Sequence, residues 1–175
     1  VEGRFIVDAT GARVKLAGVN WAGAHLPKEV PDGLDKARVE DLAASIRRFG
    51  MNSVRLTFSN ELVEQNAIVP DEAVAASPRL KGLRALDVLD ATVAALAAEG
   101  LLVILNNHTS DSVWCCGDTD DNMLWYNDRY PESAWIDDWK AIATRYRDVP
   151  AVIGVDLRNE PRFPAQWGDA LGPDF

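Results

Sequence analysis

Apolar residues along the chain follow two alternating spacings, which predict strands and helices in turn. Short apolar runs predict four strands, at residues 16–21, 53–58, 101–105 and 152–160. Between them, apolar residues recur at three- and four-residue steps, which predicts helices at 35–49, 86–99 and 135–149. Asp35 can cap the first helix, and Gly50 and Gly100 can end the first two. This alternation is typical of a parallel α/β sheet built from right-handed crossovers.

The first residues carry a different signal. Two short strand-like segments, at 5–7 and 13–16, flank the glycine-containing turn 8–11. Such a pattern predicts a β-hairpin ahead of the first parallel strand. In a barrel, we expect this hairpin to close the bottom.

The fourth predicted strand leads directly into a carboxylate. Its residues 152–157 are apolar enough to be buried on both faces of a sheet, and Asn159-Glu160-Pro161 follows. Pro161 has no N–H for a strand ladder and favours an extended backbone at Glu160. We therefore expect a carboxylate at the carboxyl end of this strand, where α/β barrel enzymes carry their chemistry.

Loop lengths indicate which edge of the sheet is the working face. Segments 59–78 and 108–131, after the second and third strands, are much longer than ordinary connections, whereas the helix-to-strand connections are short. Long loops on one side of a sheet are where binding sites form. The polar and aromatic residues at these strand ends are Asn20, Trp21, Arg55, Asn106, Asn107, His108, Asn159 and Glu160.

Composition narrows the classes of partner. A chain of 175 residues with 47% hydrophobic residues is long enough for one domain with a core. Its net charge of −9 argues against nucleic acid and against an anionic membrane surface. Its two histidines, His25 and His108, lie in separate loops, so we expect no metal site. No Gly-x-Gly-x-x-Gly turn follows a strand, which disfavours an open sheet with a phosphate-containing ligand, and we expect no cofactor.

The order of three motifs points to a known family. Arg55, His108 and Asn159-Glu160-Pro161 on successive strands resemble glycoside hydrolase family 5, the cellulase-like retaining enzymes of clan A. Segments 110–116 and 121–127 resemble the third loop of a cellulase-like subgroup. The resemblance covers nearly the whole chain and implies the first four βα units of a TIM (β/α)8 barrel, preceded by the N-terminal β-hairpin. It also implies a secreted enzyme that hydrolyses a β-linked glucan or a related polysaccharide.

The resemblance assigns a role to each motif. Glu160 would be the general acid/base, and Asn159 would hydrogen-bond the 2-hydroxyl of the sugar. Arg55 would hold the nucleophilic carboxylate ionised, and His108 would line the cleavage subsite with Asn20 nearby. Each residue also has a purely structural alternative: a solvated loop carboxylate for Glu160, a structural salt bridge for Arg55 and a hydrogen-bonded core histidine for His108.

Tryptophans and cysteines leave alternatives open. Trp21, Trp114 and Trp125 lie in or beside the working-face loops, where an indole can stack on a sugar ring or instead pin its own loop. Trp135 and Trp139 fall on the apolar face of the third helix, where core packing explains them better. The adjacent Cys115 and Cys116 can form a disulfide or remain reduced, and the sequence leaves both possibilities open.

One element of the family's chemistry is absent from this sequence. A retaining glycosidase needs two carboxylates about 5 to 5.5 Å apart, and the family takes the second from its seventh strand. The last strand predicted here is the fourth, whereas a complete barrel runs to about 250 residues. We therefore expect residues 1–175 to be the N-terminal half of a catalytic barrel, completed by a longer parent, another chain or a second copy. The alternative is a non-catalytic carbohydrate-binding or structural fragment.

Overall fold

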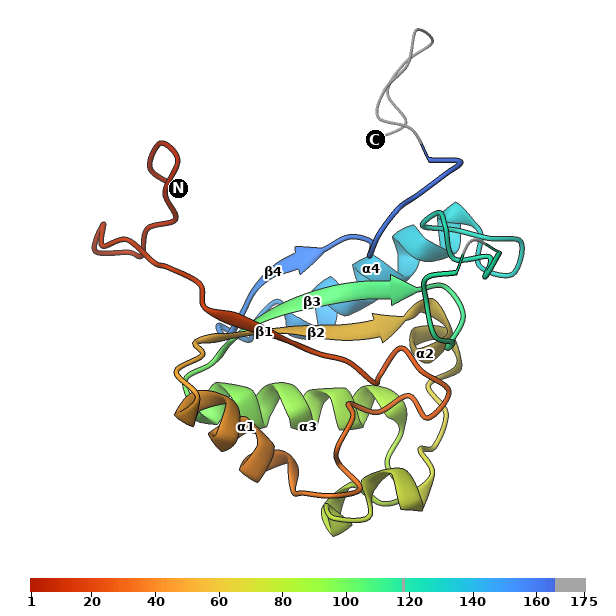
Figure 1. Cartoon of the computed structure of the whole chain (residues 1–175), viewed down its shortest axis with the longest axis horizontal. Helices are drawn as coiled ribbons and strands as arrows, with labels where there is room; N and C mark the ends of the chain where they lie inside the picture. The colour runs from red at the N-terminus through yellow and green to blue at the C-terminus, as the bar shows by residue number, and fades with distance from the viewer. Residues whose placement is uncertain (118, 166–175) are drawn as a thin grey trace, which may run out of the picture.

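The computed structural model describes residues 1–117 and 119–165 and contains a parallel four-stranded sheet in the order β1-β2-β3-β4 (Figure 1). The strands are β1 (Gly18–Trp21), β2 (Ser53–Ser59), β3 (Leu102–Thr109) and β4 (Val152–Asp156). The helices are α1 (Val39–Arg48), α2 (Asn60–Gln65), α3 (Ala85–Ala98) and α4 (Glu132–Tyr146), with short 3-10 turns at Asp71–Val74 and Pro78–Leu80. The predicted strand–helix alternation is confirmed and is consistent with part of a barrel. None of the helices in the described part of the chain has the length and apolar character needed to cross a lipid bilayer.

The core lies between one face of the sheet and the helices α1, α3 and α4. Parallel register places Trp21, Leu56 and Leu105 at the same level on this face, and each is buried. Helix α3 contributes Leu89 and Leu96, whose side chains are 1% and 0% exposed. Burying one such side chain stabilises the fold by about 1.5 to 3 kcal/mol. The helix-facing side of the sheet is therefore committed to packing, and its other face is left for polar side chains.

Helix α1 begins later than its apolar pattern indicates. Asp35 does not cap it, because the amides of Lys36 and Ala37 bond to the carbonyl of Gly33 in a separate turn. The helix begins at Val39, whose amide donates to Ser77 Oγ at 3.1 Å. At the other end Phe49, the last apolar residue of the predicted helix 35–49, is 82% exposed and so does not belong to its buried face. The contact to Ser77 is made far along the chain, so local periodicity does not encode where this helix begins.

Strand β4 is not buried on both faces as predicted. Ile153, Val155 and Leu157 are 46%, 50% and 54% exposed. Val155 lies level with the buried Leu105 of β3 and so belongs to the helix-facing side of the sheet. β4 is the edge strand of this sheet, and the described residues leave about half of each of these side chains uncovered.

The predicted N-terminal hairpin is not confirmed as a pair of strands. Residues 1–17 contain the turn at Asp8, whose Oδ1 accepts hydrogen bonds from Thr10 and Ala12, and an isolated antiparallel bridge between Val7 and Arg13. In Figure 1 this segment projects away from the sheet near the start of β1. A lone two-stranded ribbon is marginal in water, and Ile6 is 50% exposed, so little packing supports one here.

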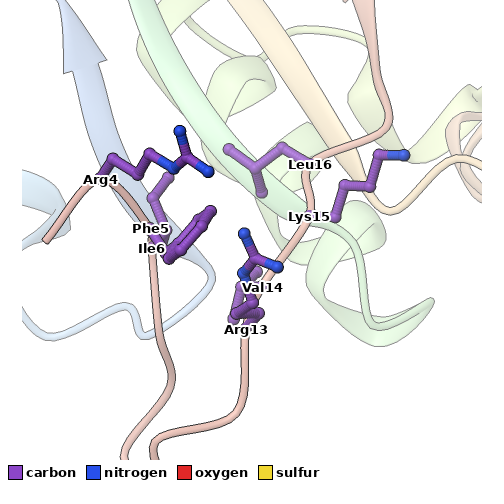
Figure 2. Close-up of a pocket in the computed structure, with 7 residues that line it drawn as sticks. All are labelled: Arg4, Phe5, Ile6, Arg13, Val14, Lys15 and Leu16. Carbon is purple, nitrogen blue, oxygen red and sulfur yellow. The ribbon is translucent and has the colours of Figure 1, made fainter. Parts of the chain in front are cut away.

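A hollow in this N-terminal segment lies away from the predicted working face. Phe5 is one of the residues that line it (Figure 2). The Arg13 guanidinium carbon lies 3.1 Å from the Phe5 ring centroid. Arg4 and Lys15 add two further cations to its wall. All of these residues precede β1 and therefore lie at the amino ends of the strands, opposite the long loops. We place the candidate site at the carboxyl ends instead.

Candidate active site

Arg55 is the centre of a polar cluster on the face of the sheet opposite the core. Register aligns Asn20 of β1 with Arg55 of β2, and both side chains lie on this face. Arg55 Nη1 donates to Asn20 Oδ1 at 2.8 Å, and Arg55 Nη2 donates to Asn159 Oδ1 at 2.8 Å. Three residues singled out from the sequence, on β1, on β2 and just after β4, are thus in direct contact.

Asp156, the last residue of β4, neutralises Arg55. Arg55 Nε donates to Asp156 Oδ2 at 2.7 Å, and Nη2 lies 2.6 Å from the same oxygen. The two side chains are 29% and 35% exposed, so the pair is partly shielded from water. Sequence reasoning did not name Asp156. The signal was present, because an arginine inside an apolar strand needs an acidic partner and Asp156 is the carboxylate within the fourth strand.

The two histidines lie against each other beside this cluster. Their ring centroids are 4.0 Å apart, His25 Nδ1 lies 2.9 Å from Thr57 Oγ1, and His108 Nδ1 lies 2.7 Å from Asn106 Oδ1. Burial, reinforced by the charge of Arg55, lowers the pKa of His25 to about 4. Burial, followed by the charges of His25 and Arg55, lowers the pKa of His108 to about 3. Both imidazoles are neutral near pH 7 and act there as hydrogen-bonding groups.

Cys115 and Cys116 form a disulfide between adjacent residues. This resolves the alternative that the sequence left open. The Asn159 amide nitrogen lies 3.6 Å from Cys115 Sγ and 3.5 Å from Cys116 Sγ, and His108 Nε2 lies 3.5 Å from Cys115 Sγ. The disulfide therefore lies between two of the predicted sugar-binding residues.

Glu160 is exposed and adopts an unexpected backbone conformation. Its φ is 42°, in the left-handed region, so the extended backbone expected before Pro161 is wrong. This conformation costs a non-glycine residue about 1 to 3 kcal/mol and persists only where its surroundings impose it. The neighbouring contacts impose it. The backbone N–H of Asn159 donates to the carbonyl of Asn107 at 2.9 Å, and Arg162 Nη1 donates to the carbonyl of Glu160 at 3.3 Å.

Two arginines that flank Asn159 and Glu160 tie this segment to the long loop after β3. Arg158 is 7% exposed and donates to Asn107 Oδ1 at 2.8 Å and to the carbonyl of Asn122 at 3.2 Å. Arg162 Nη2 lies 2.6 Å from Asp120 Oδ1, with which it forms an ion pair. Burial and the charge of Arg162 lower the pKa of Arg158 to about 10, so Arg158 remains charged near pH 7. Neither anchor was predicted, because each depends on the path of a loop.

The three candidate tryptophans occupy different environments. Trp21 is 8% exposed and donates its indole N–H to the carbonyl of Asp32 at 2.9 Å. Trp125 is half-buried and donates to Glu132 Oε1 at 2.9 Å. Trp114 is 74% exposed and directly precedes the disulfide. Trp114 therefore presents the largest free aromatic surface of the three.

A buried hydrogen-bonded chain connects helix α4 to Arg158. Asp138 Oδ2 accepts from the Asn60 amide at 2.6 Å, and Asn60 Oδ1 accepts from the Asn107 amide at 3.1 Å. Asn107 Oδ1 in turn accepts from Arg158. Burial raises the pKa of Asp138 to about 6, with smaller contributions from nearby carboxylates. The chain thus ends in a carboxyl group that changes protonation in the mildly acidic range.

Replacing Asp138 by asparagine should alter the pH dependence of stability. Asp138 is 7% exposed, and folding favours its protonated form. Its contribution to stability is therefore fully present below about pH 4 and is lost as the pH rises through about 6. We subtract the free energy of unfolding of the parent from that of Asp138→Asn. Between pH 4 and pH 7 we expect this difference to rise by about 1 to 3 kcal/mol in favour of the variant. Urea unfolding at each pH measures this difference.

Asp137→Asn is the matched control, because the Asp137 side chain is 71% exposed on the same helix. The difference in free energy of unfolding between Asp137→Asn and the parent should change by less than about 0.5 kcal/mol from pH 4 to pH 7, since exposed charged groups contribute little to stability. If the difference in free energy of unfolding between Asp138→Asn and the parent stayed constant with pH, the raised pKa assigned to Asp138 would be wrong.

Comparison with known proteins finds one matching family model and several related enzymes. A family model described as "Cellulase (glycosyl hydrolase family 5)" matches residues 7–172. An endoglucanase of Paenibacillus polymyxa is 34% identical over 167 residues, covering 95% of this chain and 41% of that protein. The major extracellular endoglucanase of Xanthomonas campestris is 36% identical over 165 residues, covering 94% of this chain and 33% of that protein.

Solved structures show the same relationship. The catalytic domain of the Xanthomonas campestris enzyme superimposes with a TM-score of 0.85 at 35% identity, covering 98% of this chain and 48% of that one. A cellotetraose complex of an endocellulase from Pyrococcus horikoshii gives 0.78 at 30% identity, covering 96% and 45%. The chain thus spans less than half the length of the curated relatives and solved chains that are compared here.

Proposed function

Because the chain belongs to the cellulase family, glycosyl hydrolase family 5, we propose that it carries the general acid/base side of a retaining glycosidase that cleaves a β-linked glucan. The observation that carries this proposal is the 2.8 Å hydrogen bond from Arg55 to Asn159. That bond holds the segment carrying Glu160 against the polar face of the sheet, at the carboxyl ends of its strands.

Glu160 is proposed to protonate the bridging oxygen of the glycosidic bond and then to deprotonate the incoming water. A sugar oxygen is a poor leaving group, and its departure leaves positive charge at the ring, so a carboxylic acid at the bond lowers the barrier. Glu160 is exposed at the rim and follows a residue that is held firmly, which suits a group that must reach a bound polymer.

Asn159 is proposed to bind the 2-hydroxyl of the sugar. Its Oδ1 accepts from Arg55, so its Nδ2 is the end that faces the disulfide and remains available as a donor. A hydrogen bond to the 2-hydroxyl strengthens as charge develops in the transition state. Arg55 therefore sets which end of the amide meets the substrate.

The nucleophile of this reaction is proposed to come from outside residues 1–175. Arg55 has five N–H groups, and within the described residues its contacts go to Asn20, Asn159 and Asp156. The contact to Asn20 uses one hydrogen of Nη1, and the other is available for a further carboxylate. A second carboxylate at this position would be kept ionised by the guanidinium charge.

The remainder of the barrel is the proposed partner of β4. The half-exposed Ile153, Val155 and Leu157 form an apolar edge that a following strand and helix would cover. The relatives are at least twice as long as the part that this chain matches. We propose a longer parent as the source of that cover, with another chain or a second copy as the alternatives.

The proposed substrate is a neutral β-linked glucan outside the cell. The structure of one relative contains cellotetraose, and Trp114 offers an exposed ring on which a pyranose can stack. An uncharged polymer is compatible with a net charge of −9. The disulfide is typical of an oxidising compartment, and a related endoglucanase is described as extracellular, which supports secretion.

Turnover of cellotetraose, whose sugar leaving group needs a proton, tests this proposal. We expect residues 1–175 alone to be inactive, because they lack the nucleophile, and activity to appear when the remainder of the barrel is present. The activity should be lost in Glu160→Ala. Glu160-dependent turnover by the isolated chain would instead show a second carboxylate recruited within it or from a second copy. A completed barrel that is inactive, or as active without Glu160, would contradict the proposed function.

A further inference from the structure

We propose that the Cys115–Cys116 disulfide is a positioning element of the sugar site, which orients the Asn159 amide and keeps the His108 imidazole available to a substrate hydroxyl. The inference rests on the proposed function, since it assigns the support for residues that would contact the sugar. Its basis is the location of the disulfide, whose sulfurs lie within 3.6 Å of the nitrogens of both side chains.

The Asn159 amide is held from both ends. Arg55 donates to its Oδ1 at 2.8 Å, and its Nδ2 faces both sulfurs at 3.6 and 3.5 Å. Sulfur is a weak hydrogen-bond acceptor. The disulfide can therefore fix the direction of the amide without competing strongly with an incoming sugar oxygen, whereas a carboxylate at the same place would retain the donor.

His108 depends on the oxidised form for a different reason. Its Nδ1 faces the acceptor Asn106 Oδ1 at 2.7 Å, so in the neutral imidazole Nδ1 carries the proton and Nε2 is an acceptor. Nε2 lies 3.5 Å from Cys115 Sγ, and a disulfide sulfur has no hydrogen to donate. A thiol at Cys115 would donate its S–H to Nε2 and occupy that acceptor. The disulfide thus leaves Nε2 free to accept from a hydroxyl group.

This arrangement predicts a loss of activity that depends on the 2-hydroxyl. The test uses the complete enzyme, with an aryl β-cellobioside and its 2-deoxy counterpart. We expect Cys115→Ala with Cys116→Ala to lower kcat/KM about tenfold on the first substrate, as for one modest hydrogen bond, and less than about twofold on the second. Adding Asn159→Ala to this double variant should lower kcat/KM less than it does in the parent, because the two changes act on one contact.

Asn159→Ala alone separates the two proposals. If Asn159→Ala lowers kcat/KM equally on the 2-hydroxy and the 2-deoxy substrate, the role of Asn159 in the proposed function is wrong. If Asn159→Ala discriminates but the cysteine variant loses equally on both substrates, or on neither, the disulfide does not act through Asn159 and the inference is overturned.

Reduction tests the disulfide without a substitution and, unlike the alanine variant, also places a thiol beside His108 Nε2. Dithiothreitol passes two electrons and two protons to the sulfurs of Cys115 and Cys116, which become thiols while dithiothreitol closes to its cyclic disulfide. We expect kcat/KM on the 2-hydroxy substrate to fall about tenfold in the parent, to recover on reoxidation, and to stay unchanged in the double alanine variant. Unchanged activity in a parent with both thiols titrated as free would overturn the inference.

Discussion

Glu160→Gln should lower kcat/KM for cellotetraose by about 10² to 10⁴-fold in the complete enzyme, the range for loss of a general acid. Glutamine keeps the size and polarity of the side chain but has no proton to deliver to the leaving oxygen. A dinitrophenyl glycoside leaves as a weakly basic phenolate and needs no proton for departure. Its cleavage should therefore be much less affected than that of cellotetraose, and the product release curve should show a burst as the glycosyl-enzyme accumulates.

Glu72→Gln is the control for this experiment, because Glu72 is exposed on the 3-10 turn Asp71–Val74, in the connection between α2 and α3. It should leave both rates within about twofold, as expected for a surface substitution away from the site. Equal losses on the two substrates after Glu160→Gln would mean that Glu160 does not act as the acid. No loss on either substrate would instead make Glu160 the solvated loop carboxylate that its exposure also permits.

The fold was predictable from sequence where each element is determined by its own residues. The strands 53–58 and 101–105 and the helix around Leu89 and Leu96 follow from periodicity, since a buried face imposes it locally. The start of α1 was not, because it depends on Ser77, which is remote in sequence. Nor was the exposure of Val155, because burial of an edge strand depends on what lies beside it.

The sequence predicted those residues of the candidate site that lie at the carboxyl ends of the strands. Asn20, Arg55 and Asn159 were identified because the carboxyl ends of parallel strands converge on one edge of a sheet, and the structure places them in contact. His25 was missed as a neighbour of His108 on β3, because its position is set by the loop after β1, whose path carries no periodic signal. The φ of Glu160 also lies beyond sequence reasoning, because Asn107 and Arg162 impose it against the preference set by Pro161.

Arg55 links these observations, because one planar cation on β2 contacts β1, β4 and the segment that follows β4. It orients Asn20 on β1 and Asn159 after β4, and Asp156 neutralises its charge. Lysine carries the same charge as arginine, but its three N–H donors share one nitrogen, which cannot replace the separate Nε, Nη1 and Nη2 contacts of the guanidinium. A substitution that keeps the charge therefore separates positioning from neutralisation.

Arg55→Lys should lower kcat/KM by about 10² to 10³-fold in the complete enzyme, because the Asn159 amide is no longer oriented and the acid next to it loses its support. Its thermal midpoint should fall less than that of Arg55→Met, which leaves Asp156 half-buried without a cation. Calorimetry and kinetics on the same preparations measure the two effects. The double variant Arg55→Lys with Asn159→Ala should lose less activation free energy than the two single variants added together, because both substitutions remove the same Arg55–Asn159 contact.

Arg145→Lys is the matched control for this cation. Arg145 also binds two carboxylates, Asp87 and Asp90, through its guanidinium, but its partners lie on helix α3 with side chains 48% and 42% exposed. It should leave kcat/KM unchanged, because exposed ion pairs contribute little and none of these three residues lies at the site. If Arg55→Lys also left kcat/KM unchanged, Arg55 would be only a structural partner of Asp156, and the orientation of Asn159 would have to come from the disulfide alone.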